Sequence, residues 1–311
     1  MVNDISNAKH AVDKLANEVG RIILGKDTEI KLALTCILAG GHLLIEDVPG
    51  VGKTLLARSL ARCLGLSFSR IQFTSDLMPA DVIGVSIYQQ NDSAFVFHKG
   101  PLFAQMVLAD EVNRATPKSQ SALLEAMEEK QVTVDGTTWE LPEPFVVIAT
   151  QNPVQQIGTY PLPESQLDRF LMQIGLGYPS EVLERKLLRG DDRRGLLKTL
   201  TPQISADELP KLQQAARGIE VSEALLDYVQ ALTRHTREHP DFELGLSPRA
   251  SIDLINAARA WALIQGHAGV HPEDLQAVFC AVAGHRLRLK SASGAIAGNA
   301  AERVLAEVAI P

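Results

Sequence analysis

The sequence predicts an α/β fold with a parallel sheet and inserted β-hairpins, followed by an all-α domain. Short apolar runs alternate with amphipathic stretches in the first part of the chain, a pattern typical of strands joined by helical crossovers. Strand-like alternation disappears after Tyr178-Pro179. Because 311 residues are too many for one core of typical size, we divide the chain into an α/β core, residues 1–178, and a helical domain, residues 179–311.

Each part of this fold rests on a pattern of apolar residues. Helical spacing over 2–19 and 27–38 predicts two opening helices. Apolar runs predict strands over 43–46, 68–73, 106–110 and 145–150, with a helix over about 53–64. Two antiparallel segments, 85–98 and 131–141, predict inserted hairpins. The second part predicts helices over 224–238, 248–265 and 272–288, and Ser247-Pro248 forms a start signal for the middle one.

Composition excludes several classes of protein. The chain is 46% hydrophobic and 22% charged, as in ordinary globular proteins. It has no apolar run long enough to span a bilayer and no signal-peptide pattern, so we expect a cytoplasmic protein. A net charge of −7 argues against nucleic acid as the partner. Three widely spaced cysteines fit neither a disulfide framework nor a four-ligand zinc site.

The segment Asp47–Thr54, DVPGVGKT, lies between a predicted strand and a predicted helix, the context that a phosphate-binding Walker A loop requires. Gly50 and Gly52 allow backbone N–H groups to converge on phosphate oxygens. Lys53 is then placed to neutralise the β- and γ-phosphates, and the Thr54 hydroxyl is a ligand for Mg²⁺. These residues predict ATP and Mg²⁺ as cofactors. Asp47 replaces the first glycine of the pattern, and its carboxylate repels triphosphate unless it is turned aside.

Two carboxylates follow the apolar run 106–109, as in a Walker B strand. Asp110 is predicted to hold the hydrated Mg²⁺ and Glu111 to polarise the attacking water. Alone, such a pair is usually just a solvated strand end, but it gains weight from the Walker A loop upstream. Asn152, after the 145–150 strand, is placed to hydrogen-bond the γ-phosphate or the water. Its alternative role is to turn the chain before Pro153.

Five strings together resemble the MoxR family of AAA+ ATPases, over about Gly20 to Leu275: EDVPGVGKT, LADEVNRA, ATQNP, LPESQLDRF and LSPRA. An Asp in the first string is usual in that family, so Asp47 is a family trait rather than a defect. The resemblance implies a P-loop NTPase fold, with an AAA+ core and a helical lid. Its hairpins match inserts of the helix-2-insert branch, and both are candidate elements for contacting a client protein.

The resemblance also implies roles for individual residues. Asn152 corresponds to sensor 1, Arg169 to an arginine finger that reaches a neighbouring subunit, and Arg249 to sensor 2 on the lid. Without the resemblance, Arg169 is open to interpretation as a surface ion pair with Asp168. Gly25 and Lys26 correspond to the segment beside adenine. The nucleotide contacts expected are Asp47, Val48, Pro49, Gly50, Val51, Gly52, Lys53, Thr54, Leu55 and Gly25.

The resemblance implies that the chain forms a ring, expected to be a hexamer. It also implies that the ring hydrolyses ATP in order to remodel or mature a protein complex. The implied partners are a von Willebrand factor A-domain protein and a client complex. Alternatives are a slow nucleotide-state switch or scaffold, a magnesium-chelatase-like ATPase subunit, and a DNA-associated motor. The acidic charge disfavours the motor. Residues 73–85 lack the aromatic-apolar-glycine loop of threading unfoldases, which favours local remodelling.

A second pattern points to a different chemistry. His235-Thr-Arg-Glu-His239 matches H-x-x-E-H, and histidines at i and i+4 share a helix face that can bind zinc. The sequence shows no third ligand, and Pro240 ends the helix at once. Cations near a helix C-terminus are favoured by the helix dipole alone. We therefore interpret the two histidines as residues of a helix end rather than as a metal site.

Overall fold

The computed structural model describes residues 2–90, 93–152, 158–189, 193–290 and 297–310. Its centre is a five-stranded sheet in the order β2-β5-β8-β1-β9, and every neighbouring pair is parallel. The strands are β1 (Leu43–Glu46), β2 (Phe68–Gln72), β5 (Met106–Asp110), β8 (Val146–Gln151) and β9 (Met172–Ile174). The predicted parallel α/β core is confirmed. Strand β9 was missed, because three residues are too few to show a period.

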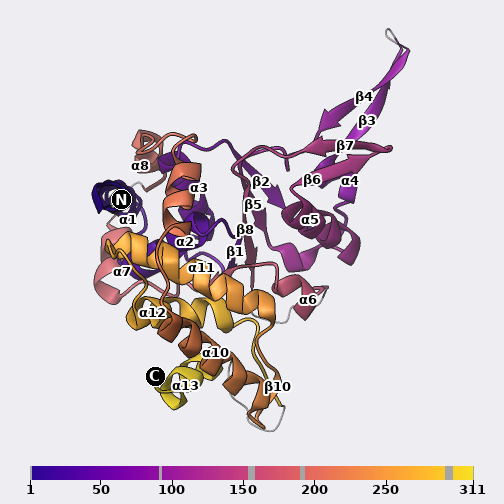
Figure 1. Cartoon of the computed structure of the whole chain (residues 1–311). Helices are drawn as coiled ribbons and strands as arrows, with labels where there is room; N and C mark the ends of the chain where they lie inside the picture. The colour runs from indigo at the N-terminus through magenta and orange to yellow at the C-terminus, as the bar shows by residue number, and fades with distance from the viewer. Residues whose placement is uncertain (1, 91–92, 153–157, 190–192, 291–296, 311) are drawn as a thin grey trace.

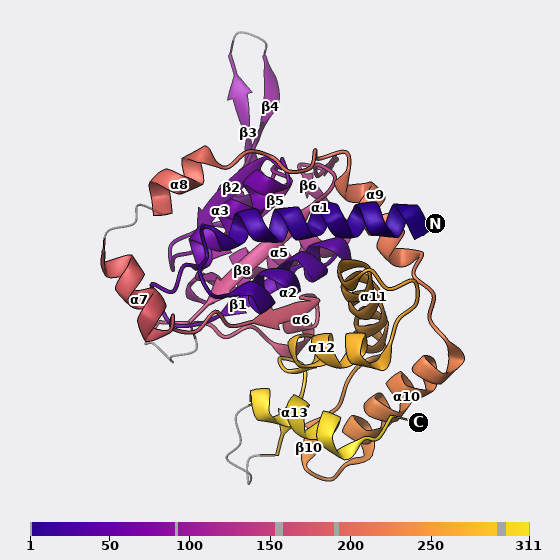
Figure 2. The ribbon, with the colours of Figure 1, turned by 90° about the vertical axis from the view of Figure 1, so that its left-hand side faces the viewer.

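Helices cover both faces of this sheet (Figure 2). Alternate strand residues point to opposite faces, so Leu43 and Ile45 join one apolar cluster and Leu44 joins another. The first cluster includes residues of α1 (Val2–Gly20), α2 (Asp27–Leu38) and α3 (Lys53–Cys63). The second includes residues of α5 (Pro117–Glu129). The sheet is therefore the middle layer of three.

Two hairpins leave this core, as predicted. The first has β3 (Gly84–Gln89) and β4 (Ala94–Lys99), follows α4 (Pro79–Ile83), and projects from the body of the molecule (Figure 1). Residues 91–92 of this predicted hairpin lie outside the described residues. The second has β6 (Gln131–Val134) and β7 (Thr137–Glu140). Trp139 stacks on Phe97 with ring centroids 4.9 Å apart, so this tryptophan joins the two hairpins rather than standing free.

The remainder of the described chain is mainly helical, as predicted. A short 3₁₀ helix, η1 (Val112–Arg114), follows β5. The later helices are α6 (Glu164–Leu167), α7 (Glu181–Leu188), α8 (Arg193–Thr199), α9 (Leu209–Arg217), α10 (Glu223–Glu238), α11 (Pro248–Gln265), α12 (Pro272–Ala283) and α13 (Ala297–Glu307). The helix predicted over 272–288 is shorter. Its last residues enter a small antiparallel pair, β10 (Phe242–Leu244) with β11 (Arg288–Leu289).

Helix α11 connects the two parts of the chain. Its predicted start is confirmed, because Ser247 Oγ accepts the Ala250 N–H at 3.0 Å and Pro248 occupies the first turn. Its buried residues, including Leu254 and Leu263, belong to the same apolar cluster as α1 and α2. One continuous core therefore runs across the division at 178/179, which stays a prediction. In the described part of the chain, no helix has the length and apolarity needed to cross a bilayer.

Candidate active site

Polar residues meet where the strands of the parallel sheet end. Gln72 pairs in register with Asp110, and Glu46 with Gln151. A cavity of about 1120 Å³ opens beside this edge. It is lined by Pro49, Gly50, Gly52, Lys53, Thr54, Leu55, Arg58, Ala61, Arg62, Leu66, Phe68, Arg70, Asp110, Glu111, Asn152, Leu197 and Lys198. Carboxyl ends of parallel strands are the usual ligand position in open α/β sheets.

The loop between β1 and α3 has the backbone that a phosphate-binding loop needs. Gly50 and Gly52 have φ values of 87° and 102°, a region in which side chains with a Cβ are strained. A Cβ built on Gly50 meets no atom within 4 Å, so its conformation rather than crowding requires glycine there. Helix α3 begins at Lys53, directly after the loop. Its N-terminus therefore faces the cavity with the dipole end that favours anions.

Asp47 is turned away from the cavity, as expected for an acidic residue beside a phosphate site. Its Oδ1 accepts the Val48 N–H at 2.7 Å, and its Oδ2 accepts the N–H of Gly177. Gly177 lies beyond β9, in the segment that leads to α7. The buried carboxylate thus neither lines the cavity nor opposes bound phosphate directly. It fastens the start of the loop to the segment that leaves the core.

Lys53 reaches across the cavity floor. Its Nζ donates to the Asn152 side-chain oxygen at 2.8 Å and to the Asp47 carbonyl. Burial lowers the pKa of this ammonium, and the carboxylates of Asp47, Asp110 and Glu111 oppose that shift. The two residues assigned from separate strings, Lys53 and Asn152, are therefore brought into direct contact. A γ-phosphate has both a cation and an amide available at this point.

Asp110 and Thr54 supply an oxygen donor set suited to Mg²⁺. The Thr54 hydroxyl lies 3.4 Å from Asp110 Oδ2, and the Thr150 hydroxyl donates to Asp110 Oδ1 at 2.6 Å. Hydroxyl and carboxylate oxygens, completed by phosphate and water, are what this ion prefers. Arg70 of β2 also donates to Asp110 Oδ2, at 2.7 and 3.1 Å. Sequence reasoning missed Arg70.

Glu111 lines the cavity directly after Asp110, and its backbone has a strained conformation with φ of 58°. Its backbone N–H is held by the Thr150 hydroxyl at 2.9 Å. Its carboxylate accepts from the Gln72 amide at 3.0 Å and pairs with Arg114 at 3.1 Å. Asn152 Nδ2 lies 3.4 Å from the other carboxylate oxygen. Gln72 and Thr150 were also missed.

Two of the missed residues, Arg70 and Gln72, share one detectable signal. Arg70 and Gln72 are alternate residues of β2, so their side chains leave the same face of the sheet, next to β5. Two exposed polar residues on one face of a strand of the central sheet indicate a site. Without the strand order, however, the sequence does not tell which carboxylates these residues meet. Arg58 and Arg62 of α3 and Lys198 of α8 add further positive charge to the cavity wall.

Arg169 and Arg249, the two arginines predicted as site residues, lie outside the cavity. Arg169 donates to the Leu124 carbonyl of α5, and Arg249 of α11 forms a bidentate pair with Glu128, at 2.8 and 3.2 Å. Neither is among the residues that line the cavity. Both instead gather at the C-terminal end of α5. We call this group, Arg169, Arg249 and Glu128, the arginine face.

The segment that carries Arg169 is held by α12 and the residues after it. Arg286 is buried, pairs with Asp168 at 2.8 Å, and donates to the Phe170 carbonyl at 3.0 Å. His285 also contacts that carbonyl, at 2.9 Å. Asp168 is therefore paired with Arg286 rather than with its neighbour Arg169. The helical part of the chain thereby fixes where Arg169 sits.

Gly25 is not placed in the cavity. It has φ of 65°, and a Cβ there would lie 2.2 Å from Leu183 Cδ1. This glycine therefore permits close approach of α7. Its neighbour Lys26 donates to the Tyr178 carbonyl at 3.2 Å. Among the expected nucleotide contacts, Asp47, Val48 and Val51 also lie outside the cavity lining.

This sheet order, loop and carboxylate pair define an ATPase of the AAA class. Two comparisons with family models agree: residues 42–172 match the ATPase family associated with various cellular activities (AAA), and residues 234–308 match an AAA lid domain.

Comparisons with known proteins narrow the class further. The chain is 45% identical to YeaC of Bacillus subtilis, over 95% of this chain and 92% of that protein. It is 44% identical to Chaperone MoxR1 of Mycobacterium tuberculosis, over 90% of this chain and 76% of that one. A crystal structure of a candidate ATPase from Cytophaga hutchinsonii superposes with a TM-score of 0.91 at 38% identity, covering 99% and 97% of the two chains. The chain belongs to the MoxR family of AAA ATPases.

Proposed function

We propose that this chain is a Mg²⁺-dependent ATPase of a ring assembly, expected to be a hexamer, in which ATP hydrolysis remodels or matures a protein complex. Within each subunit, Lys53 and Asn152 bind the terminal phosphate and Thr54 and Asp110 hold the ion. Glu111 orients the attacking water. Mg²⁺ supplies the positive charge that neutralises the phosphates.

The observation that carries this proposal is the division of charged groups between two places. Lys53, Asp110, Glu111 and Asn152 converge on one cavity. Arg169 and Arg249 lie together on the arginine face, outside that cavity. A guanidinium that stabilises transition-state charge must reach the phosphates. The arginine face of one subunit meets this need if it packs against the cavity of the next.

The test is ATP turnover measured against protein concentration. We expect native turnover per chain to rise with concentration as the ring assembles. Glu111→Gln should bind ATP normally and lose about 10²-fold or more in turnover, because the positioned base is gone. Arg169→Ala should lose about 10³-fold at every concentration. Arg217→Ala is a matched control, because Arg217 is a cationic residue of α9 that does not line the cavity.

Normal hydrolysis by Arg169→Ala at high concentration would exclude the shared site. The client and its adaptor need a separate experiment. We propose that a protein with a von Willebrand factor A domain connects the ring to its client. ATP-loaded Glu111→Gln should retain such a protein together with the client, whereas the Lys53→Ala variant, which lacks the phosphate contact, should not.

One observation favours a second candidate, a slow nucleotide-state switch. Arg70 donates two hydrogen bonds to Asp110, the carboxylate that is expected to hold Mg²⁺. If Arg70 keeps this pairing with ATP bound, turnover is slow. If the chain is a slow switch, Arg70→Ala should speed hydrolysis. If it is the ATPase proposed above, the same change should leave turnover unchanged or lower it. The same turnover assay applies to a magnesium-chelatase-like ATPase subunit. The acidic net charge makes a DNA-associated motor the least favoured alternative.

A further inference from the structure

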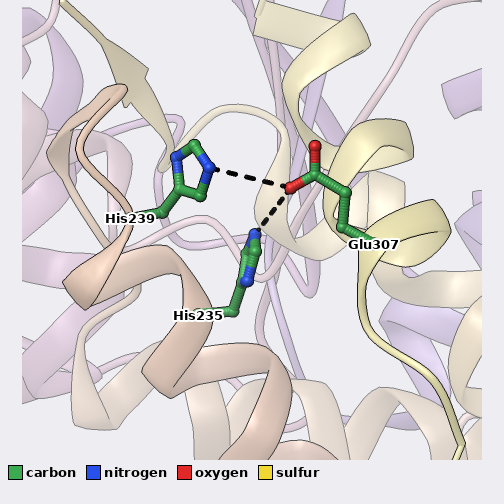
Figure 3. A group of neighbouring side chains, drawn as sticks. All are labelled: His235, His239 and Glu307. Carbon is green, nitrogen blue, oxygen red and sulfur yellow. Dashed lines mark hydrogen bonds and ion pairs between the residues drawn. The ribbon is translucent and has the colours of Figure 1, made fainter.

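Two histidines and a glutamate from distant parts of the chain meet on the helical domain (Figure 3). His235 lies in the last turn of α10, His239 caps its C-terminus, and Glu307 ends α13. One ligand atom from each lies within 4.8 Å of the others. Glu307 Oε2 is 2.9 Å from His235 Nε2 and 3.9 Å from His239 Nε2. Glu307 is thus a third side chain in reach of the histidine pair, one that the sequence did not show.

Charges around the three side chains favour a cation. The C-terminus of α10 presents the negative end of its helix dipole to both histidines. Arg303 holds the other oxygen of Glu307, Oε1, at 2.6 Å, and leaves Oε2 turned to the imidazoles. Asp241 pairs with Arg303 at 2.6 Å, which offsets the positive charge of the guanidinium.

We propose that His235, His239 and Glu307 form a binding site for a divalent transition-metal ion of the zinc class. Two imidazoles and one carboxylate are a ligand set typical of Zn²⁺, and histidines at i and i+4 of a helix present their rings on one side. The side chains of both histidines are 22% exposed and that of Glu307 is 35% exposed. Water therefore has access to complete the coordination, and the ion can enter and leave.

Both histidines must adjust before they can bind a metal through Nε2, and for His239 the change also breaks a backbone contact. Its Nδ1 accepts the Asp241 N–H over a long 3.3 Å contact, which places the ring proton on Nε2. Binding a metal through Nε2 requires this proton to move to Nδ1, so the contact with Asp241 must break. His235 needs the same change, because its Nε2 donates a hydrogen bond to Glu307 Oε2 at 2.9 Å and must give up that proton before it can bind a metal. The loss of these two hydrogen bonds makes the site weaker than a structural four-ligand site.

Metal binding here closes a long segment of the chain. Glu307 follows His235 by 72 residues, and these positions stand at the two ends of the part that matches an AAA lid, 234–308. A link between the ends of a long segment restricts the unfolded chain and stabilises the folded one. The ion would therefore fasten α13 to α10 and hold the lid domain together.

A second cluster, His267, His271 and Asp274, has the same residue types but is less suited. Asp274 is buried and already holds the His267 ring, at 2.9 Å, and the backbone N–H of His271, at 3.0 Å. Its carboxylate caps the start of α12, so a metal would compete with the helix for it. We use this cluster as an internal comparison.

The experiment is calorimetric titration of the full chain with ZnCl₂, together with hydrogen exchange of α13. We expect one strong site per chain and slower exchange over the described residues of α13 when zinc is present. His235→Ala and Glu307→Gln should each weaken binding by at least about tenfold. Binding of Co²⁺ should give the visible absorption of a site with nitrogen ligands in the native chain and lose it in His235→Ala.

Controls separate this site from other histidines. His98→Ala removes an exposed histidine of the β3-β4 hairpin and should bind zinc as the native chain does. Glu307→Gln keeps the size of the side chain, and its unfolding curve without metal shows whether the variant is folded. Absence of stoichiometric binding, unchanged binding by both site variants, or loss of binding in His271→Ala instead would overturn the proposal.

Discussion

The cavity and the arginine face differ in how their charged side chains are held. In the cavity, Lys53 and Asp110 are largely buried, and each contacts several partners from neighbouring strands. On the arginine face, Arg249 and Glu128 are 45% and 37% exposed and pair chiefly with each other. The cavity is thus organised within one chain, whereas the arginine face has an exposed ion pair beside the half-buried Arg169.

This difference indicates which half of the site depends on assembly. A buried group with several partners keeps its geometry without help. An exposed pair in water gains little from its contact and exchanges partners readily. We therefore expect the cavity to bind nucleotide in the isolated chain, and we propose that the arginine face acts only beside a neighbouring subunit. The predictions below test this division.

The largest expected effect is recovery of activity from two inactive variants. Glu111→Gln has an intact arginine face, and Arg169→Ala has an intact cavity. In a ring mixed at random from equal amounts, about a quarter of interfaces join the two intact halves, so up to about a quarter of the native turnover should return. The measurement is ATP turnover of the mixture against each variant alone. If the mixture stays inactive although the variants assemble together, both halves act within one chain.

Acid should weaken the fold beside the arginine face, because two buried neutral histidines lie there. His42 precedes β1 and contacts the Val147 N–H and the Met127 carbonyl of α5, while His285 contacts the Phe170 carbonyl beside Arg169. Burial lowers the pKa of His42 to about 4 and that of His285 to about 3.

Since these folded-state values lie below that of the unfolded chain, stability is complete above about pH 6.5 and falls as the pH drops toward the folded values. Each histidine should account for about 2 kcal/mol of unfolding free energy lost between pH 7.5 and 5. Urea unfolding of the native chain, His42→Asn and His285→Asn at the two pH values measures this. Equal pH dependence in all three chains would contradict it.

Replacing Asp47 is expected to have a smaller effect on the unfolding free energy. Its carboxylate satisfies the backbone N–H groups of Val48 and Gly177, so Asp47→Ala leaves two donors without it and should cost about 1–3 kcal/mol of unfolding free energy. ATP should bind less tightly, because the loop start is released from the segment after β9. Asp47→Asn keeps one acceptor oxygen and should fall between. Unfolding curves and nucleotide titration give both numbers, and a neutral Asp47→Ala would show that the carboxylate does not fasten the loop.

The two regions also differ in how far the sequence predicts them. Lys53 was found from the Walker A loop, and Asp110 and Asn152 from their places at or after apolar strands, because parallel strands end at one edge of a sheet. Arg70 and Thr150 were missed because only the strand order shows that both meet Asp110. Arg169 came from family resemblance alone.

The position of Arg169, like the third ligand Glu307, depends on contacts between residues more than 40 positions apart. Periodicity reports local structure and which face of an element is buried. It carries no information on which distant side chains meet. The strand ends of the core were therefore predictable, whereas contacts between side chains far apart in the chain were not, whether they lie within the core or within the lid.

The smallest expected change in stability is at the arginine face. The pair of Arg249 and Glu128 is exposed, so Glu128→Ala should change the unfolding free energy by less than about 1 kcal/mol. If Arg249 acts on a neighbouring subunit, releasing it from Glu128 should leave turnover at high protein concentration unchanged or raise it, whereas Arg249→Ala should lower it with equally little effect on stability. Urea unfolding and turnover of the two variants give the comparison. Equal loss of turnover in both would mean that the pair itself, rather than a released Arg249, is what the ring requires.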